Sequence, residues 1–127
     1  MHIYEGIIRF SSAAMPPCYL YKAATKKIEE IQLSGLPLGG LYGATYDQIE
    51  RSFEVGEVFV LLSDGLPEAP NLQGDQIGYQ AVEDCILANQ HLSADGIKNA
   101  LIELGQNWLA GKQTPDDITF VIVKKNI

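Results

Sequence analysis

The sequence predicts an α+β fold, with antiparallel β-sheets early in the chain and helices packed against them. Three observations predict it. Short apolar or alternating runs, separated by Pro, Gly, Asn or Lys, occupy the segment up to Leu62, a helical period follows Gly78, and a last apolar run begins at Ile118. With 127 residues, 46% of them hydrophobic, the chain is long enough for one small domain with its own core.

Several runs before Gly65 have the composition of β-strands. They are Ile3–Phe10, Cys18–Ala23, Ile28–Leu33, Tyr46–Phe53 and Val58–Leu62. Residues 23–27 supply the tip of a hairpin, and Pro16-Pro17 marks the first break because proline cannot donate to a strand ladder. We therefore expect the first half of the chain to be mostly antiparallel sheet.

Two helices are expected after Gly78, because apolar residues then recur on one face of a helical period. The first face carries Ala81, Cys85 and Ala88, and the second carries Ile97, Leu101, Leu104 and Trp108. Ser93 is placed to cap the second helix, with Asp95 in its first turn, and Gly111 suits its end. Trp108 is expected to pack in the core.

Two acidic clusters stand at the ends of apolar runs. Val58–Leu62 leads into Ser63-Asp64-Gly65, and Asp116-Asp117 opens the last run. A carboxylate at a strand end is held firmly, and a neighbouring Gly leaves room for a hydrated cation. If the last strand returns to the sheet, Asp116 comes to lie beside Asp64, and together they offer the hard oxygen ligands that Mg²⁺ or Mn²⁺ prefers. The alternative is that Asp64-Gly65 is only a turn after a strand and that Asp116-Asp117 is only a polar start to the next one.

Net charge and hydropathy limit which partners and which cellular compartment suit the chain. The net charge of −7 disfavours nucleic acid and anionic membranes as partners, because both would repel the chain. No apolar stretch approaches the ~20 residues that span a bilayer, and the N-terminus lacks a signal-peptide pattern, so we expect a cytoplasmic protein.

Cys18 and Cys85 have no CxxC spacing and are expected to be reduced core thiols. His2 and His91 have no suitably spaced companions and are not candidate metal ligands.

Short motifs also follow one another in a set order. They are Ala-Ala-x-Pro-Pro at 13–17, Gly-Leu-Pro-Leu-Gly at 35–39, Ser-Asp-Gly at 63–65, Glu-Ala at 68–69 and Asp-Asp-Ile-Thr at 116–119. In this order they resemble the metal-dependent protein serine/threonine phosphatases (the PPM family), in their bacterial SpoIIE/RsbU branch. The resemblance covers about Glu5 to Lys124. It implies a single domain over residues 1–127 with a partial αββα sandwich, equivalent to the C-terminal part of the family's catalytic domain with the N-terminal half absent.

The resemblance also implies the site. Asp64 and Asp116 take the places of two metal ligands, with Gly65 and Asp117 beside them, and no residue is catalytic independently of the metal. The family uses a pair of Mn²⁺ or Mg²⁺ ions to activate a water that attacks phosphoserine or phosphothreonine. The family's bridging Asp is missing from this sequence, and Met15 stands where the branch has His. We therefore expect the chain alone to be inactive, and the resemblance leaves open whether it is itself an enzyme.

The function implied is a protein serine/threonine phosphatase domain in signal transduction, whose substrate is a phosphorylated regulatory protein such as an anti-sigma-factor antagonist. The alternative is a non-catalytic, phosphatase-like module for protein binding or regulation, which the absent bridging Asp and Met15 favour. A third is an unrelated β domain whose acidic residues all belong to turns. Because part of a sandwich exposes strand edges and apolar surface, we also expect self-association or a complementing chain.

Overall fold

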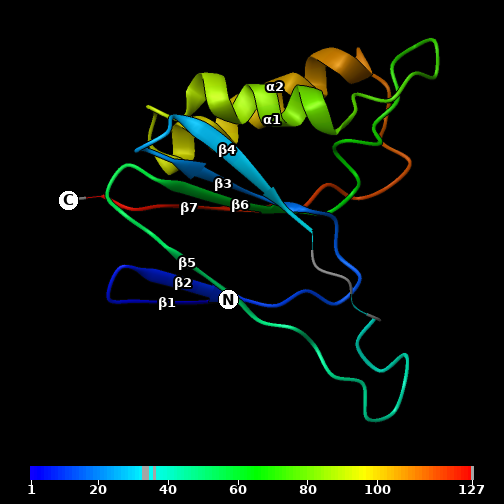
Figure 1. Cartoon of the computed structure of the whole chain (residues 1–127). Coiled ribbons are helices and arrows are strands. Elements are labelled where there is room, and N and C mark those ends of the chain that lie inside the picture. Colours follow the sequence, from blue (N-terminus) through cyan, green and yellow to red (C-terminus); the bar gives the residue numbers. More distant parts are fainter. Residues whose placement is uncertain (33–34, 36, 127) are drawn as a thin grey trace.

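The computed structural model describes residues 1–32, 35 and 37–126, which form three layers (Figure 1). A four-stranded antiparallel sheet, with strands in the order β4-β3-β6-β7, lies in the middle. Helices α1 and α2 cover one of its faces, and a three-stranded sheet in the order β1-β2-β5 covers the other. The strands are β1 His2–Tyr4, β2 Ile7–Phe10, β3 Cys18–Lys22, β4 Lys27–Ile31, β5 Ile49–Ser52, β6 Val58–Leu62 and β7 Phe120–Lys124, and the helices are α1 Tyr79–Asn89 and α2 Ala94–Leu109.

The predicted α+β class is confirmed, with strands first, helices next and one returning strand. Two strand predictions need correction. Residues 3–10 do not form one strand, because Glu5 and Gly6 adopt positive φ angles of 42° and 75° and turn the chain into the β1–β2 hairpin. The predicted strand at 46–53 is shorter, since only Ile49–Ser52 pairs with β2. The predicted hairpin tip at 23–27 is confirmed, and the predicted end of the next strand at Leu33 lies outside the described residues.

Both faces of the middle sheet are apolar because both are covered. In β6, Val58, Val60 and Leu62 pack toward the helices, while Phe59 packs toward the three-stranded sheet. Within the described residues, no helix covers the outer face of the three-stranded sheet. Three layers of the expected αββα sandwich are therefore present in this part of the chain.

Helix α1 buries a different face from the one its small residues suggested. Val82 and Ile86 are buried, whereas Ala88 is exposed and Ala81 and Cys85 are only half-buried. The larger aliphatic side chains remove more apolar area from water, and they decide which way the helix turns toward the sheet. The predicted face of α1 was therefore wrong by about one residue's rotation.

Helix α2 follows its prediction closely. The Ser93 hydroxyl accepts a hydrogen bond from the amide of Gly96 at 3.1 Å, and the face that carries Ile97 and Leu101 is buried. The Trp108 side chain packs against the same core, as expected, and its Nε1 also donates to the carbonyl of Asp75 at 2.8 Å. The loop before α1 is thereby tied to the end of α2.

The predicted placement of the two cysteines in the core agrees with the structure. Cys18 is buried and Cys85 half-buried, and both are free of disulfides. Burial raises the pKa of Cys18 to about 11, which keeps this thiol protonated and unreactive. Neither helix in the described part of the chain has the length and apolar character needed to cross a membrane.

A buried carboxylate joins the β3–β4 hairpin to the start of β6. Glu57 is 2% exposed, and it accepts hydrogen bonds from Lys22 Nζ at 2.8 Å, from the amide of Ala23 at 2.9 Å and from the amide of Glu54 at 2.8 Å. Burial alone would raise the pKa of Glu57, but the bonds from Lys22 and the two amides outweigh it, and the pKa is lowered. The ionised form of Glu57 therefore stabilises the fold.

We expect Glu57→Gln to lower the free energy of unfolding by ~1–3 kcal/mol at neutral pH, because a buried charge partner of Lys22 is lost. The folded-state pKa is lowered, so this stabilisation is present above the ordinary carboxyl value of 4.5 and is lost as the pH falls through the folded-state value. Urea denaturation across this range should show the gap between wild type and variant closing in acid. Glu54→Gln is the control, since this side chain is exposed, and an equal loss there would contradict the assignment.

Candidate metal centre

Pairing between β6 and β7 brings the two acidic clusters together. The register places Leu62 opposite Phe120, and the amide of Ser63 continues the ladder by donating to the carbonyl of Thr119 at 2.8 Å. The turn that carries Asp64 is therefore adjacent to the segment that carries Asp117. The prediction that the last strand returns to lie beside the Asp64 strand is confirmed.

A serine hydroxyl fastens the two segments at this point. Ser63 Oγ accepts a hydrogen bond from the amide of Thr119 at 3.0 Å and lies 3.4 Å from the carbonyl of Asp117, to which it donates. This contact was not foreseen from the sequence. The only available signal was that a hydroxyl residue directly precedes the Asp.

Gly65 is required for the close approach of the two segments. A Cβ atom at Gly65 would lie 2.1 Å from the carbonyl oxygen of Asp117, a distance that no side chain tolerates. Gly65 was expected to leave room beside a cation, and its position also has this packing reason. The absence of a side chain at Gly65 is what allows the Asp64 turn to rest on the Asp117 backbone.

The carboxylates differ in exposure. Asp64 is half-buried, whereas Asp116 and Asp117 are exposed. Asp116 Oδ1 accepts a hydrogen bond from the amide of Asp117 at 2.8 Å, and the carbonyl of Asp64 accepts one from the amide of Glu68 at 3.0 Å. These bonds organise both turns and leave most of the carboxylate oxygens available to a cation or water.

Tyr79, at the start of α1, is a neighbour that the sequence did not reveal. Its pKa is raised, first by burial and then by the negative charges of Glu68 and Asp64. The phenol stays protonated and can donate a hydrogen bond toward this acidic region. Tyr79 therefore belongs to the surroundings of the candidate site.

The donor set suits a hard cation in kind but is small in number. Within the described ranges, no three His, Cys, Asp or Glu side chains gather at a spacing suited to a metal ion. Glu68 is exposed, as expected, and so are His2 and His91. Met15 is 47% exposed, and it offers no oxygen or nitrogen where the branch has His. The oxygen donors present are the Asp64 and Asp116–Asp117 carboxylates.

Two apposed sheets with a helix pair on one side, and aspartates at the end of the middle sheet, are an arrangement that the chain shares with solved PP2C-type phosphatase domains. The family profile described as "Stage II sporulation protein E (SpoIIE)" matches residues 1–126, and the chain belongs to this family. The predicted membership of the SpoIIE/RsbU branch of the PPM phosphatases is therefore confirmed.

Known proteins agree with this assignment. The chain is 24% identical to "Phosphoserine phosphatase RsbU" of Bacillus subtilis over 127 residues, which cover 93% of this chain and 35% of RsbU. Among solved structures, the SiaA-PP2C domain of Pseudomonas aeruginosa superposes with a TM-score of 0.78 at 19% identity, covering 95% of this chain and 47% of that one. The Mn-presoaked phosphatase domain of SpoIIE from Bacillus subtilis gives 0.68 at 16% identity, with 94% and 51% covered. The chain thus spans about a third of RsbU and about half of these solved domains.

We expect Gly65→Ala to separate the two acidic segments, because the added methyl would meet backbone that cannot move aside. The free energy of unfolding should fall by ~1–3 kcal/mol, measured by urea denaturation. Gly105→Ala is the matched control. Its added methyl would lie 3.1 Å from the end of the Leu66 side chain, which can shift, and alanine favours the helix. Equal destabilisation by both changes would contradict a special role for Gly65.

Proposed function

We propose that this chain is the metal-binding part of a protein serine/threonine phosphatase domain that hydrolyses phosphoserine or phosphothreonine on a regulatory protein. One observation carries the proposal: in a chain of the SpoIIE family, Gly65 packs directly on the backbone of Asp117, so that the aspartates of both motifs stand at one end of the middle sheet. Residues 1–127 would act as a single domain equivalent to the C-terminal part of the family's catalytic domain.

Asp64 and Asp116 would hold Mn²⁺ or Mg²⁺, since both ions take carboxylate oxygens. Such an ion supplies a water activated for attack on phosphorus and offsets the charge that develops on the phosphoryl oxygens. The protein's own contribution is to fix the two carboxylates. Ser63 and Gly65 hold the Asp64 turn against Asp117, and Asp117 donates its amide to Asp116, which limits the motion of that carboxylate.

Little or no turnover is expected from the chain alone. With only the Asp64 and Asp116 carboxylates as protein ligands, water would fill most of the coordination sphere of Mg²⁺ or Mn²⁺. An ion held this weakly would position its bound water poorly for attack. Within the described residues, no group of three or more His, Cys, Asp or Glu side chains is placed to hold a metal ion, which supports this expectation.

The substrate we propose is a phosphorylated regulatory protein such as an anti-sigma-factor antagonist. Membership of the SpoIIE family and the likeness to RsbU, which is named a phosphoserine phosphatase, support it. The net charge of −7 favours a neutral or basic protein surface over nucleic acid or an anionic membrane. We place this activity in the cytoplasm.

The second candidate is a binding or regulatory module that keeps the phosphatase scaffold without catalysis. Met15 and the small donor set favour it. The two candidates differ in whether the Asp64 and Asp116 carboxylates bind a divalent cation at all.

Titration of Mn²⁺ into the purified chain by calorimetry separates these candidates. We expect weak binding that Asp64→Asn and Asp116→Asn each reduce by about tenfold or more, because each removes a charged ligand worth at least ~1.4 kcal/mol. Asp84→Asn is the matched control, since Asp84 is an exposed aspartate on α1 whose carboxylate accepts a hydrogen bond from Gln80 on the same helix.

Phosphate release from para-nitrophenyl phosphate is measured in the same samples. Binding without turnover supports a partial metal site of a phosphatase. Turnover that both Asn variants abolish would show that the chain completes the site, and absence of binding would favour the binding module instead.

A further inference from the structure

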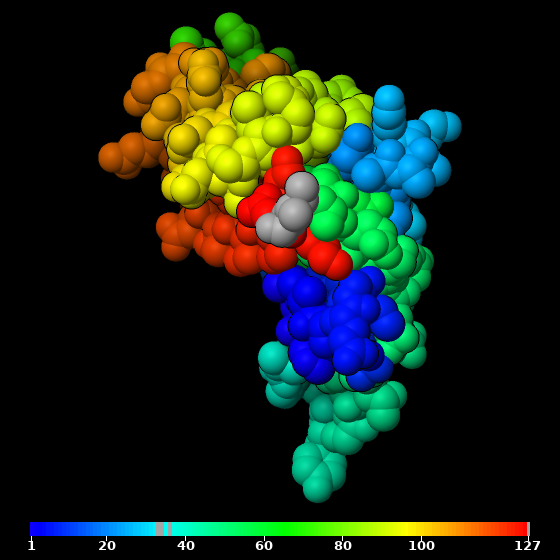
Figure 2. All heavy atoms as spheres, turned by 90° about the vertical axis from the view of Figure 1, so that its left-hand side faces the viewer, coloured from blue at the N-terminus to red at the C-terminus, as the bar shows by residue number. Residues whose placement is uncertain are grey.

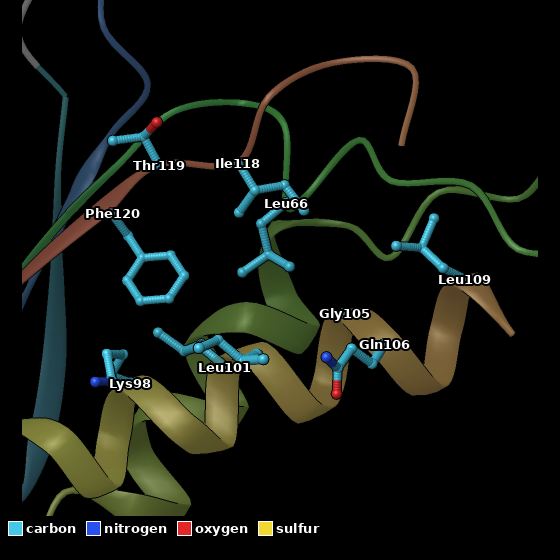
Figure 3. Close-up of a pocket in the computed structure, with 10 residues that line it drawn as sticks. Leu66, Lys98, Leu101, Gly105, Gln106, Leu109, Ile118, Thr119 and Phe120 are labelled. Atoms are coloured by element: carbon cyan, nitrogen blue, oxygen red, sulfur yellow. The ribbon is translucent and has the colours of Figure 1, made fainter. Parts of the chain in front are cut away.

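The two helices meet the middle sheet through different kinds of side chain. Beneath α2 the contact is mostly apolar, and Figure 3 shows Leu66, Leu101 and Phe120 converging on the space there. Helix α1 packs against β4 instead, and Figure 2 shows it, in yellow-green, beside the light-blue β3–β4 hairpin. This second contact contains charged groups as well as apolar ones.

The alternation of side chains along β4 turns one of its two glutamates toward α1. Ile28 belongs to the core beneath the helices, and Ile31 belongs to the core between the sheets. Residues two apart share a face of a strand, so Glu30 faces the helices and Glu29 faces the other sheet. Glu29 has a cationic partner there, since its Oε1 accepts a hydrogen bond from Arg51 Nε at 2.7 Å.

Glu30 and Glu83 bring like charges to the contact between β4 and α1. Glu83 follows the buried Val82 on α1 and is half-buried, whereas Glu30 is exposed. Burial raises the pKa of Glu83, and the negative charges of Glu30 and Asp84 raise it further. Within the described residues, no Lys, Arg or His forms an ion pair with either glutamate. The two carboxylates therefore repel each other without a described cation to offset their charge.

A buried hydroxyl adjoins this pair. Tyr19 on β3 is 0% exposed and stands opposite Glu30 in the β3–β4 register, and in the described part of the chain its Oη has no hydrogen-bond partner. Burial raises the pKa of Tyr19, and Glu30, Glu83 and Tyr79 raise it further, so the phenol stays protonated and able to donate. A carboxyl oxygen would satisfy it, but an ionised carboxylate loses hydration when it moves inward.

We propose that Glu30 and Glu83 take up one proton between them in mild acid, so that the contact of α1 with β4 tightens as the pH falls. The proton comes from solvent, and the carboxyl that takes it donates its O–H to the other carboxylate. The pair thereby loses one of its two negative charges. A pair with a single charge is less costly to bring toward the Tyr19 hydroxyl, which then gains an acceptor.

The pH dependence has the opposite sign to that of Glu57. Because the folded-state pKa of Glu83 is raised, the folded chain binds more protons than the unfolded chain between this value and the ordinary carboxyl value of 4.5. In that range the α1 contact gains stability as the pH falls. The pKa of Glu57 is lowered, so its contribution is lost only below 4.5. Mild acid therefore tightens α1 before it weakens the bonds to Glu57.

The start of α1 connects this contact to the Asp64 turn. The amide of Gly78, which directly precedes the helix, donates to the carbonyl of Pro67 at 2.8 Å. The segment that follows Asp64 is thereby bonded to the beginning of α1. The proposal titrates neither Asp64 nor Asp116, and it goes beyond the proposed phosphatase function and stands independently of it.

An NMR titration of the Glu83 side-chain carboxyl in the full chain tests the shared proton. We expect its midpoint to lie above 4.5 and to move toward 4.5 in Glu30→Gln, because a neighbouring negative charge is removed. Glu103→Gln is the matched control, since Glu103 is an exposed glutamate on the other helix. A midpoint that Glu30→Gln leaves in place, or that Glu103→Gln moves equally, would overturn the proposal.

Urea denaturation shows whether the pair affects stability. Glu83→Gln should raise the urea midpoint by about 0.2–0.5 M near pH 7, and the gap should close toward pH 4.5. Glu30→Gln should raise the midpoint of the wild type but not that of Glu83→Gln, because the repulsion is then already gone. Tyr19→Phe should stabilise the chain near pH 7 more than in acid. Additive effects of the two glutamate variants, or gains by Glu83→Gln and Tyr19→Phe that do not change with pH, would contradict the shared proton.

Discussion

The antiparallel pairing of β6 with β7 is the interaction on which the rest of the structure depends. It completes the middle sheet, and through the same register it brings the Ser63–Gly65 turn against Asp117. Residues more than fifty positions apart in sequence meet only because of this ladder. One strand pairing therefore both completes the middle sheet and assembles the candidate metal centre.

Much of this arrangement could be predicted from the sequence, because periodicity and motif order carry the information. The switch from short apolar runs to a helical period at Gly78 gave the order of elements, and the acidic clusters at the ends of apolar runs indicated that Asp64 and Asp116 belong together. The β1–β2 turn was missed because Glu5 adopts a positive φ, which is uncommon for a residue with a side chain. The buried face of α1 was missed because small residues recur on its other side, and only contact with the sheet decides between the two faces.

The contributions of Ser63, Gly65 and Tyr79 to the candidate site could not be predicted in full for a related reason. Each acts across the fold: Ser63 on the Thr119 amide, Gly65 on the Asp117 carbonyl, and Tyr79 next to the charges of Asp64 and Glu68. A linear motif identifies carboxylates that suit a cation, but the groups that hold those carboxylates in place come from segments that the motif does not contain. For Gly65, the sequence suggested space for an ion, and the structure adds a contact with the backbone.

Strand β7 is also attached to the helical layer. Lys124 Nζ donates to the carbonyls of Gln90 at 2.7 Å and Leu92 at 2.6 Å, where α1 ends and its carbonyls lack partners within the helix. The same ammonium group opposes the negative end of the α1 dipole. Because the chain is synthesised from its N-terminus, the turn between the helices and the edge of β6 gain these hydrogen bonds only after β7 has been added. The apolar edge of β6 is therefore left unpaired during synthesis until β7, which follows the helices in the sequence, has been added.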